Sequence, residues 1–164
     1  MQGAERVRAR ARPLVARAIA AGAARFDVEA SEFGRRLANG DVAAWNAFRA
    51  SLALDIARLL ADLEPAIDAI YACPYPGRPG GPVLLIACER PQTPALAHAI
   101  RPLNQELGDC LRSAGIELAE ALFDVRVLDL DDPHLRRGIS PVVDGRQLIP
   151  IRVWARPSRV AAPA

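Results

Sequence analysis

Carboxylates and one histidine gather in a short stretch of the chain. This acidic turn is formed by Asp129, Asp131, Asp132 and His134. Carboxylate oxygens and an imidazole nitrogen are suitable ligands for a divalent cation or for a metal-activated water. Asp132 stands directly before a proline, however, where an aspartate commonly caps the start of a helix. The acidic turn is therefore a candidate metal site, with a helix cap as the simpler interpretation.

A proline- and glycine-rich loop at residues 73–82 offers a second candidate site. In it, Arg78, Gly80 and Gly81 can present a guanidinium and closely approaching backbone N–H groups to an anion. No helix start follows the loop to complete a phosphate site. A solvated turn is therefore the simpler interpretation.

The N-terminus carries arginine at alternate positions, namely Arg6, Arg8, Arg10 and Arg12. Alternation would spread charge around a helix rather than leave an apolar stripe, so residues 1–12 are expected to form a flexible arm. Such an arm can neutralise the phosphates of nucleic acid or anionic lipid. A solubilising tail is the simpler interpretation, because no aromatic residue accompanies the arginines and the net charge of the chain is only +2.

The composition excludes several classes of enzyme. All 21 basic residues are arginine, so the chain lacks the primary amine that a phosphate-binding Walker lysine, a Schiff-base lysine or a lysine general base requires. The cysteines, Cys73, Cys88 and Cys110, fit neither a disulfide framework nor paired zinc ligands. A redox pair is disfavoured as well, since Pro76 stands where the second thiol after Cys73 would be. No cofactor is predicted from these residues.

The overall pattern is that of a folded domain. With 164 residues, 51% of them apolar and 24% charged, the chain differs from disordered sequences and suits one core. No apolar run approaches the roughly 20 residues of a membrane-spanning helix, and the N-terminus lacks the compact apolar core of a secretory signal. Alanine, arginine and proline are abundant, as in proteins from GC-rich genomes. We therefore expect a bacterial protein of the cytoplasm.

Helices are expected in the N-terminal part. Pro13 suits the first turn of a helix that runs to about residue 24, and Asp27 suits the cap of a short helix after it. Asp41 is expected to cap the clearest helix, which extends to Glu64 with apolar residues at steps of three and four. The apolar surface of this helix exceeds what a small sheet needs, which is typical of an interface.

Strands are expected in the C-terminal part. Apolar runs at 66–72 and 83–88 flank the glycine-rich loop, an amphipathic helix starts near Pro94, and alternation from Phe123 predicts a third strand. An Asp-Gly dipeptide at 144–145 is typical of a tight turn between strands.

These elements predict an α/β fold of the α+β type. N-terminal helices precede an α-β-β-α-β core with a small mixed or antiparallel sheet and a terminal hairpin or strand. The domain 13–155 divides into a helical part, 13–64, and a sheet-containing part, 65–155. Residues 1–12 are the expected arm and 156–164 a tail.

Residues 52–152 resemble, in the order of their elements, the minimal nucleotidyltransferase domain of the polymerase-beta superfamily. The likeness rests on a helix, a strand, the glycine-rich loop, a second strand and a helix, followed by the third strand, the acidic turn and the Asp-Gly turn. In that family a Gly-Ser pair follows the first strand and an Asp-x-Asp motif binds magnesium. This chain lacks both, since Gly81 and Val83 occupy the Asp-x-Asp positions. Only Asp124 matches a third family carboxylate, so the resemblance implies a non-catalytic relative.

The sequence leaves several functions open. The first is a non-enzymatic module, related to inactive nucleotidyltransferases, that contacts a protein partner and forms a homodimer. The second is a nucleotide- or nucleic-acid-binding accessory protein that uses the arginine arm and Arg136 and Arg137. The third is a nucleotidyltransferase with an unconventional Mg²⁺ site made from Asp124, the acidic turn and Arg78.

Overall fold

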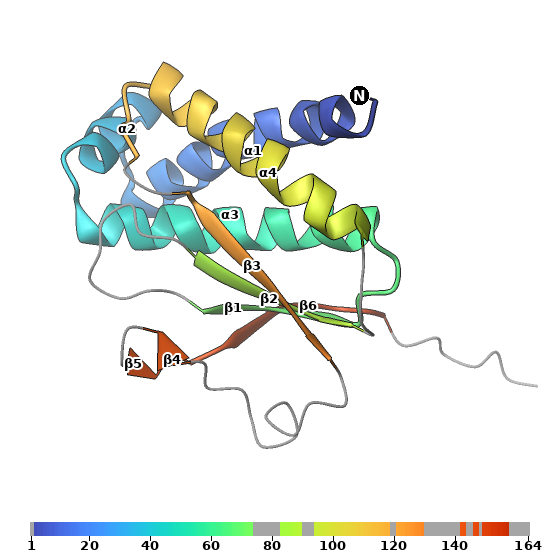
Figure 1. Cartoon of the computed structure of the whole chain (residues 1–164). Helices are drawn as coiled ribbons and strands as arrows, with labels where there is room; N and C mark the ends of the chain where they lie inside the picture. The colour runs from blue at the N-terminus through green and yellow to red at the C-terminus, as the bar shows by residue number, and fades with distance from the viewer. Residues whose placement is uncertain are drawn as a thin grey trace, which may run out of the picture.

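The computed structural model describes residues 2–73, 83–89, 94–118, 121–129, 142–143, 146–147 and 149–157. Its elements are α1 (Gln2–Phe26), α2 (Ala30–Ala38), α3 (Val42–Leu63), β1 (Ala69–Cys73), β2 (Val83–Glu89), α4 (Pro94–Ser113), β3 (Phe123–Asp129), β4 (Val142–Val143), β5 (Arg146–Gln147) and β6 (Ile151–Ala155). The labelled helices all lie on one side of the central sheet (Figure 1). This arrangement confirms the predicted α+β class.

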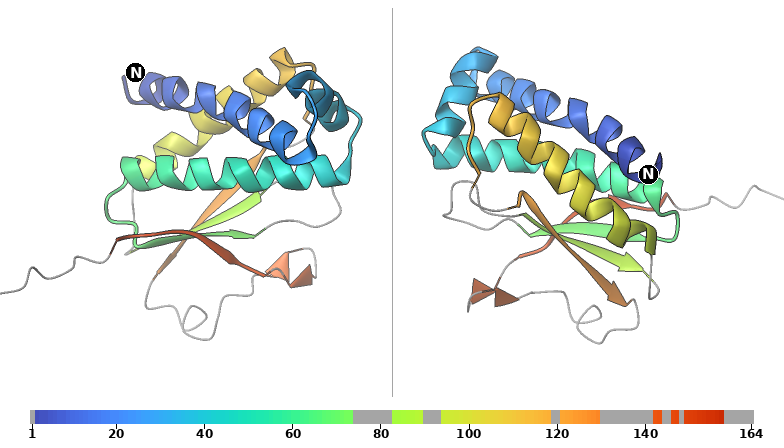
Figure 2. Two further views of the ribbon diagram at one scale, coloured as in Figure 1. Left: turned by 180° about the vertical axis from the view of Figure 1, so that it is seen from behind. Right: turned by 45° about the horizontal axis from the view of Figure 1, so that its top comes forward.

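The central sheet has four strands in the order β3-β2-β1-β6. β1 pairs antiparallel with both β2 and β6, whereas β2 and β3 are parallel and are connected through α4. β4 and β5 pair with each other on either side of the Asp-Gly dipeptide, as the sequence predicts. β6 then returns to the central sheet, where it runs beneath α3 along the near edge in the view from behind (Figure 2, left). The sheet is therefore mixed, and β6 forms one of its edges.

The arginine-rich N-terminus is helical, so the flexible arm expected for residues 1–12 is wrong. α1 continues through Pro13, which is therefore not the first residue of a helix either. Pro13 and Ala9, four residues before it, are both exposed, so the carbonyl that loses its N–H partner faces water. The opposite side of α1 is buried against α3 and α4 along its whole length. The buried residues of α1 are Val7, Ala11, Leu14, Val15, Ala18, Gly22 and Ala23.

The two aspartates expected to cap helices behave differently. Asp41 caps α3, because its Oδ1 accepts a hydrogen bond from Ala44 N at 3.1 Å. Asp27 does not cap α2, because it adopts a left-handed backbone with a φ of 53°. The N–H of the next residue, Val28, donates to Ala23 O at 3.0 Å. Asp27 therefore closes the C-terminal end of α1 instead of starting α2.

The helical layer is fixed to the sheet through α3 and α4. α3 is buried on most sides, since it lies between α1 and the sheet. In α4, the Asn104 side chain exchanges hydrogen bonds with the first residue of β3: Nδ2 donates to Phe123 O at 2.9 Å, and Oδ1 accepts from Phe123 N at 3.0 Å. These bonds satisfy both backbone groups of a buried residue and set the position of β3 under α4.

The end of β6 is also anchored. The N–H of Arg156 donates to Asp68 O at 2.7 Å, and its guanidinium donates to Ile67 O at 3.0 Å. The tail predicted from residue 156 therefore begins too early, because Arg156 belongs to the body of the domain. Residues 158–164 lie outside the described residues.

Candidate binding groove

Most residues predicted to bind a metal or an anion lie outside the described residues. These are Arg78, Gly80, Gly81, Asp131, Asp132, His134, Arg136 and Arg137. Asp129 is described as the last residue of β3. Among the residues that the structure describes, no group of three or more His, Cys, Asp or Glu is placed to hold a metal ion.

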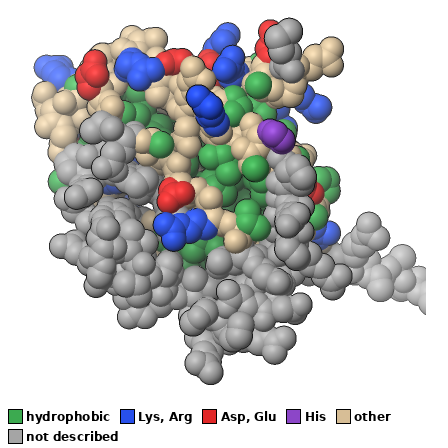
Figure 3. Space-filling view, in the orientation of Figure 1, with side chains coloured by type: hydrophobic (Ala, Val, Ile, Leu, Met, Phe, Trp, Pro, Cys, Tyr) green, Lys and Arg blue, Asp and Glu red, His purple; other side chains and the backbone are tan. Residues whose placement is uncertain are grey.

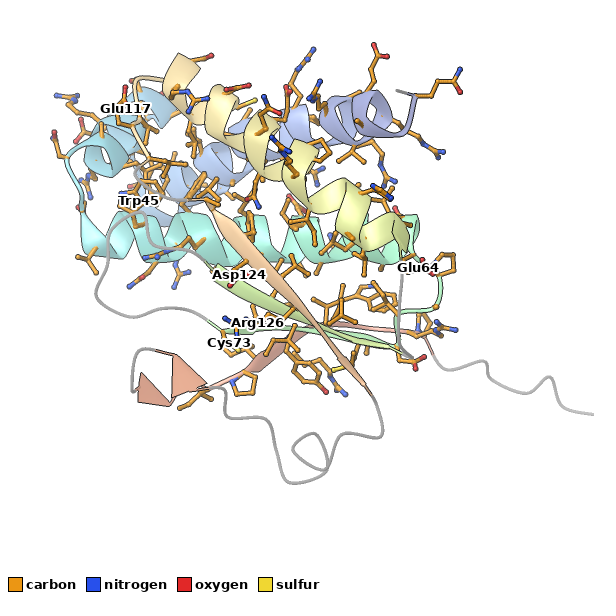
Figure 4. All side chains as sticks on the ribbon, in the orientation of Figure 1. Trp45, Glu64, Cys73, Glu117, Asp124 and Arg126 are labelled. Carbon is orange, nitrogen blue, oxygen red and sulfur yellow. The ribbon has the colours of Figure 1, made fainter. Side chains whose placement is uncertain are left out.

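Asp124, the candidate catalytic carboxylate, lies on the sheet face that points away from the helices. Its neighbours Phe123 and Val125 pack into the core, and side chains alternate between the two faces along a strand. The exposed carboxylate forms an ion pair with Arg126, with 3.6 Å between Oδ2 and Nη2; both residues are labelled in Figure 4. The described partner of Asp124 is therefore a cation, whereas a two-metal site needs further carboxylates.

Three of the N-terminal arginines engage the protein's own helices. The contacts are Arg8 with Gln105, Arg10 with Asp62 and Arg12 with Glu106, at N···O distances of 3.2, 2.6 and 2.9 Å. Glu106 raises the pKa of Arg12 through this hydrogen bond and through its charge. Arg6 is exposed. Basic and acidic side chains are mixed over the helices in the space-filling view (Figure 3), so the visible face is not a continuous basic surface.

A groove with a volume of about 620 Å³ opens on the side of α3 that faces β6. Its walls are α3 and the edge of the sheet formed by β1 and β6, and the end of α1 closes it. The lining residues are Arg25 and Phe26 of α1; Ala43, Asn46, Ala47, Arg49, Ala50 and Ala53 of α3; Ala72 of β1; and Ile151 and Val153 of β6. Its volume is about twice that of a second hollow, of about 320 Å³, between α1 and α3, and is typical of binding sites.

The groove is open because α3 presents small side chains to β6. Ala43, Ala47 and Ala50 follow one another at steps of four and three residues, so they share one helix face. A methyl group cannot span the distance to the strand. Larger side chains at these positions would fill the space, as they do on the flank of α3 that contacts α1.

Exposed large apolar side chains lie close in sequence to residues of the groove. Ile151 lines the groove, and Val42, Leu54 and Ile149 lie within two residues of residues that line it. These are four of the five large hydrophobic side chains that are exposed among the described residues, and the fifth is Val127 on β3. An exposed apolar patch around a groove is typical of an interaction site.

Positive charge is concentrated at one end of the groove. Arg25 is exposed at the end of α1, whereas Arg49 is only 3% exposed. Arg49 donates from Nε to Trp45 O at 3.4 Å and from Nη2 to Asn46 Oδ1 at 3.3 Å. Its desolvation lowers the pKa of the guanidinium. No acidic residue is among the described residues that line the groove, so a negative group would be the complementary ligand.

Sequence reasoning missed this groove. The patterns of carboxylates, glycines and alternating arginines do not indicate a surface made of alanines. The available signal was the spacing of Ala43, Ala47 and Ala50 on the side of α3 opposite its large apolar residues. This spacing predicts a helix face with small side chains. The face becomes the wall of a groove only because β6 returns to the sheet edge.

Comparison with known proteins gives one consistent similarity. The chain is similar to urease accessory protein UreD. Proteins of that name from Pseudomonas putida strains KT2440 and F1 are 37% identical to it over 87 residues, which are 48% of this chain and 30% of each relative. The protein from strain GB-1 is 34% identical over 83 residues, or 46% of this chain and 29% of the relative. The chain thus spans less than a third of the length of these relatives. No protein-family model and no solved structure matches it.

The similarity to UreD overturns the nucleotidyltransferase interpretation. The resemblance rested on element order, which unrelated α+β proteins share, while the motifs that carry the chemistry were missing. Three functions predicted from the sequence are wrong as well: an inactive nucleotidyltransferase relative, a nucleotide- or nucleic-acid-binding accessory protein, and a metal-dependent transferase. In the described part of the chain, none of the helices is long and apolar enough to cross a membrane.

Proposed function

We propose that this chain assists urease by binding a protein of the urease assembly machinery. The observation that carries the proposal is the 37% identity to urease accessory protein UreD over 87 residues. These residues are 30% of the relative, so we assign to this chain only a part of the function of such a protein. We assign to this chain the recognition of a partner protein.

The groove between α3 and β6 supports this assignment. It combines apolar walls, exposed large hydrophobic side chains and a positively charged end, which are features of protein interfaces. The described residues offer no metal cluster, and their one candidate catalytic carboxylate, Asp124, pairs with Arg126 on the other side of the sheet. Binding is therefore the activity that the described surface favours.

Co-expression tests the proposed function. The full chain, carrying an affinity tag, would be produced together with the urease structural subunits and urease accessory proteins of its host, and complexes would be isolated by affinity and size-exclusion chromatography. We expect one of these proteins to co-elute in a fixed ratio, and the urease activity of the cells to fall when the chain is omitted. If no urease component co-elutes and urease activity is unchanged without the chain, the proposal is wrong.

A matched pair of variants would connect the complex to the groove. Ala50→Arg places a long charged side chain in the groove, whereas Ala20→Arg makes the same change at an exposed alanine of α1 that does not line it. Both positions are exposed on helices, so both variants should fold. Only Ala50→Arg should weaken co-elution of the urease component. Equal behaviour of the two variants would place the interface elsewhere on the molecule.

A further inference from the structure

We infer that the groove and the open edge of β6 together bind an extended segment of a partner protein, which carries apolar side chains at alternate positions and a carboxylate. The segment would add a strand to the sheet and insert its side chains between β6 and α3. This inference deepens the proposed function, on which it rests, by naming the chemistry of the partner.

The backbone of β6 has no strand partner on one side among the described residues. Among the described strands β6 pairs only with β1. The N–H of Arg156 points toward β1, since it donates to Asp68 O. Because backbone groups alternate in direction along a strand, Trp154 points the same way, and Ala155 turns its backbone groups to the open edge. A β-bulge interrupts this alternation between Trp154 and Arg152. An added strand would use these groups.

The side chains at this edge favour pairing with another strand. Ile151 is 55% exposed and Ile149 is 78% exposed. Edge strands are usually protected by charged or proline residues. The charged residue within β6 is Arg152, which pairs with Tyr71. Ile151 pairs with Ala72, and both of these residues line the groove. Arg152 and Ile151 therefore lie on opposite faces, and the groove face of the edge is apolar.

The groove sets the side-chain pattern of the bound segment. Side chains of an added strand alternate between the two sheet faces, so every second one would enter the space between β6 and the alanines of α3. The walls around Ala47, Ala50 and Val153 are apolar, so the entering side chains should be aliphatic. On the other face, the segment would lie beside Arg152 and requires no apolar residue.

Charge decides between a partner segment and a second copy of this chain. The exposed Arg25 lines the groove and no described acidic residue does, so the complementary segment carries Asp or Glu. A second copy would present its own β6, whose charged residue is Arg152, and would bring two positively charged grooves together. The charges therefore favour a different, acidic and apolar partner.

Defined peptides test this inference without any urease protein. The probe is a seven-residue peptide in which valine and threonine alternate and each end carries a glutamate on the valine side. The control peptide has glutamine in place of glutamate. Amide chemical shifts of the isotopically labelled full chain would be followed by NMR during titration. We expect shifts in β6 and along the groove face of α3, and about fivefold weaker binding of the glutamine peptide, as for one partly exposed ion pair.

Two pairs of variants separate the contributions of charge and backbone. Arg25→Glu should abolish the preference for glutamate over glutamine, whereas Arg101→Glu, the same change at an exposed position of α4, should preserve it. Ala155→Pro removes an outward N–H at an edge position where proline is tolerated, and should abolish peptide-induced shifts in β6. Ala155→Ser keeps the N–H and should bind normally. If Ala155→Pro fails to fold, Ala50→Arg provides the blocking variant.

Each outcome decides the inference. Equal binding of the two peptides, shifts confined to other surfaces, or binding that survives both Ala155→Pro and Ala50→Arg would overturn it. A dimer detected by sedimentation that dissociates in Ala155→Pro would also overturn it, in favour of self-association through β6. Because the peptides contain no urease sequence, their failure would leave the co-expression result intact, and a failed co-expression would leave peptide binding intact.

Discussion

The two flanks of α3, one facing α1 and the other facing β6, differ in how closely they are packed. Toward α1, residues such as Phe48, Leu52 and Leu59 are buried, and the hollow along this seam is the smaller one, with about 320 Å³. Toward β6, the helix presents Ala43 and Ala50, and a groove remains. Side-chain size alone accounts for the difference, because the backbone of α3 is regular over its whole length.

Charge distinguishes the flanks as well. Along the α1 flank, arginines meet carboxylates of the same molecule, as in the pairs of Arg10 with Asp62 and Arg17 with Asp55. Along the β6 flank, Arg25 lines the groove without an acidic residue among the described lining residues. The closed flank thus pairs its arginines with carboxylates of the same molecule, whereas no described acidic residue lines the groove on the open flank. This contrast supports the β6 flank as the proposed binding surface.

The largest expected effect comes from a substitution on the closed flank, the side of α3 that faces α1. Leu52→Ala removes a fully buried side chain and should lower the free energy of unfolding by about 3 to 4 kcal/mol. Leu54→Ala is the matched change two residues away on the open side, where the side chain is 37% exposed, and should cost less than about 1 kcal/mol. Urea unfolding of both variants measures the contrast. Equal losses would mean that the two flanks are packed alike.

Close packing at the end of α1 gives the next effect. A Cβ on Gly22 would lie well inside contact distance of the Phe33 ring, which is fully buried and cannot move away. Gly22→Ala should therefore destabilise the protein by roughly 1 to 3 kcal/mol. Gly34→Ala in α2 meets nothing within 4 Å and should stabilise it by up to about 1 kcal/mol. Thermal unfolding should shift in opposite directions, and a stable Gly22→Ala variant would contradict the close contact.

Much of the fold was predictable, because it is encoded locally. The periodicity of α3, its Asp41 cap and the alternation in β3 each depend on a few neighbouring residues. The part of α1 before Pro13 was not predicted, because its arginines alternate, although Val7, Ala11 and Leu14 at steps of four and three form a buried stripe.

The candidate site was not predictable in the same way. It depends on which strand lies beside β1, and the pairing of Ala72 with Ile151 joins residues far apart in the chain. The alanines of α3 form a groove wall only when β6 lies beside β1. The sequence likewise marks Asp124 as a candidate catalytic carboxylate, and only the structure shows its ion pair with Arg126.

The buried thiol of Cys73 gives a pH-dependent contribution to stability on the sheet face opposite to the groove. Ala72 lines the groove, but Cys73 beside it is fully buried, and desolvation raises the pKa of its thiol from 9.0 to about 11. Below the unfolded pKa both states hold the proton. Above it the unfolded thiol ionises first, so stability should fall as pH rises from 9 toward 11, by about 1 kcal/mol at pH 10.

Denaturant unfolding at pH 8 and pH 10 measures this loss. Cys73→Ala should remove about 1 kcal/mol of it, because the titrating group is gone. Cys110→Ala is the control at a partly exposed thiol and should change the pH dependence less. If Cys73→Ala and the unchanged protein lose the same stability, the Cys73 thiol is hydrated in the folded protein and its burial does not raise its pKa.

The smallest expected effect concerns the ion pairs that distinguish the flanks. Arg10→Ala removes the pair with Asp62, whose N···O distance is 2.6 Å, and should cost about 0.5 kcal/mol at low salt. Because the pair is partly exposed, salt should screen it, and the loss should shrink at high ionic strength. Arg25→Ala, on the open flank, should leave stability unchanged at any salt concentration, since its proposed partner is a carboxylate of another protein. A salt-dependent loss of stability in Arg25→Ala would show that Arg25 already has a partner within the chain, and would remove the electrostatic reason for an acidic ligand.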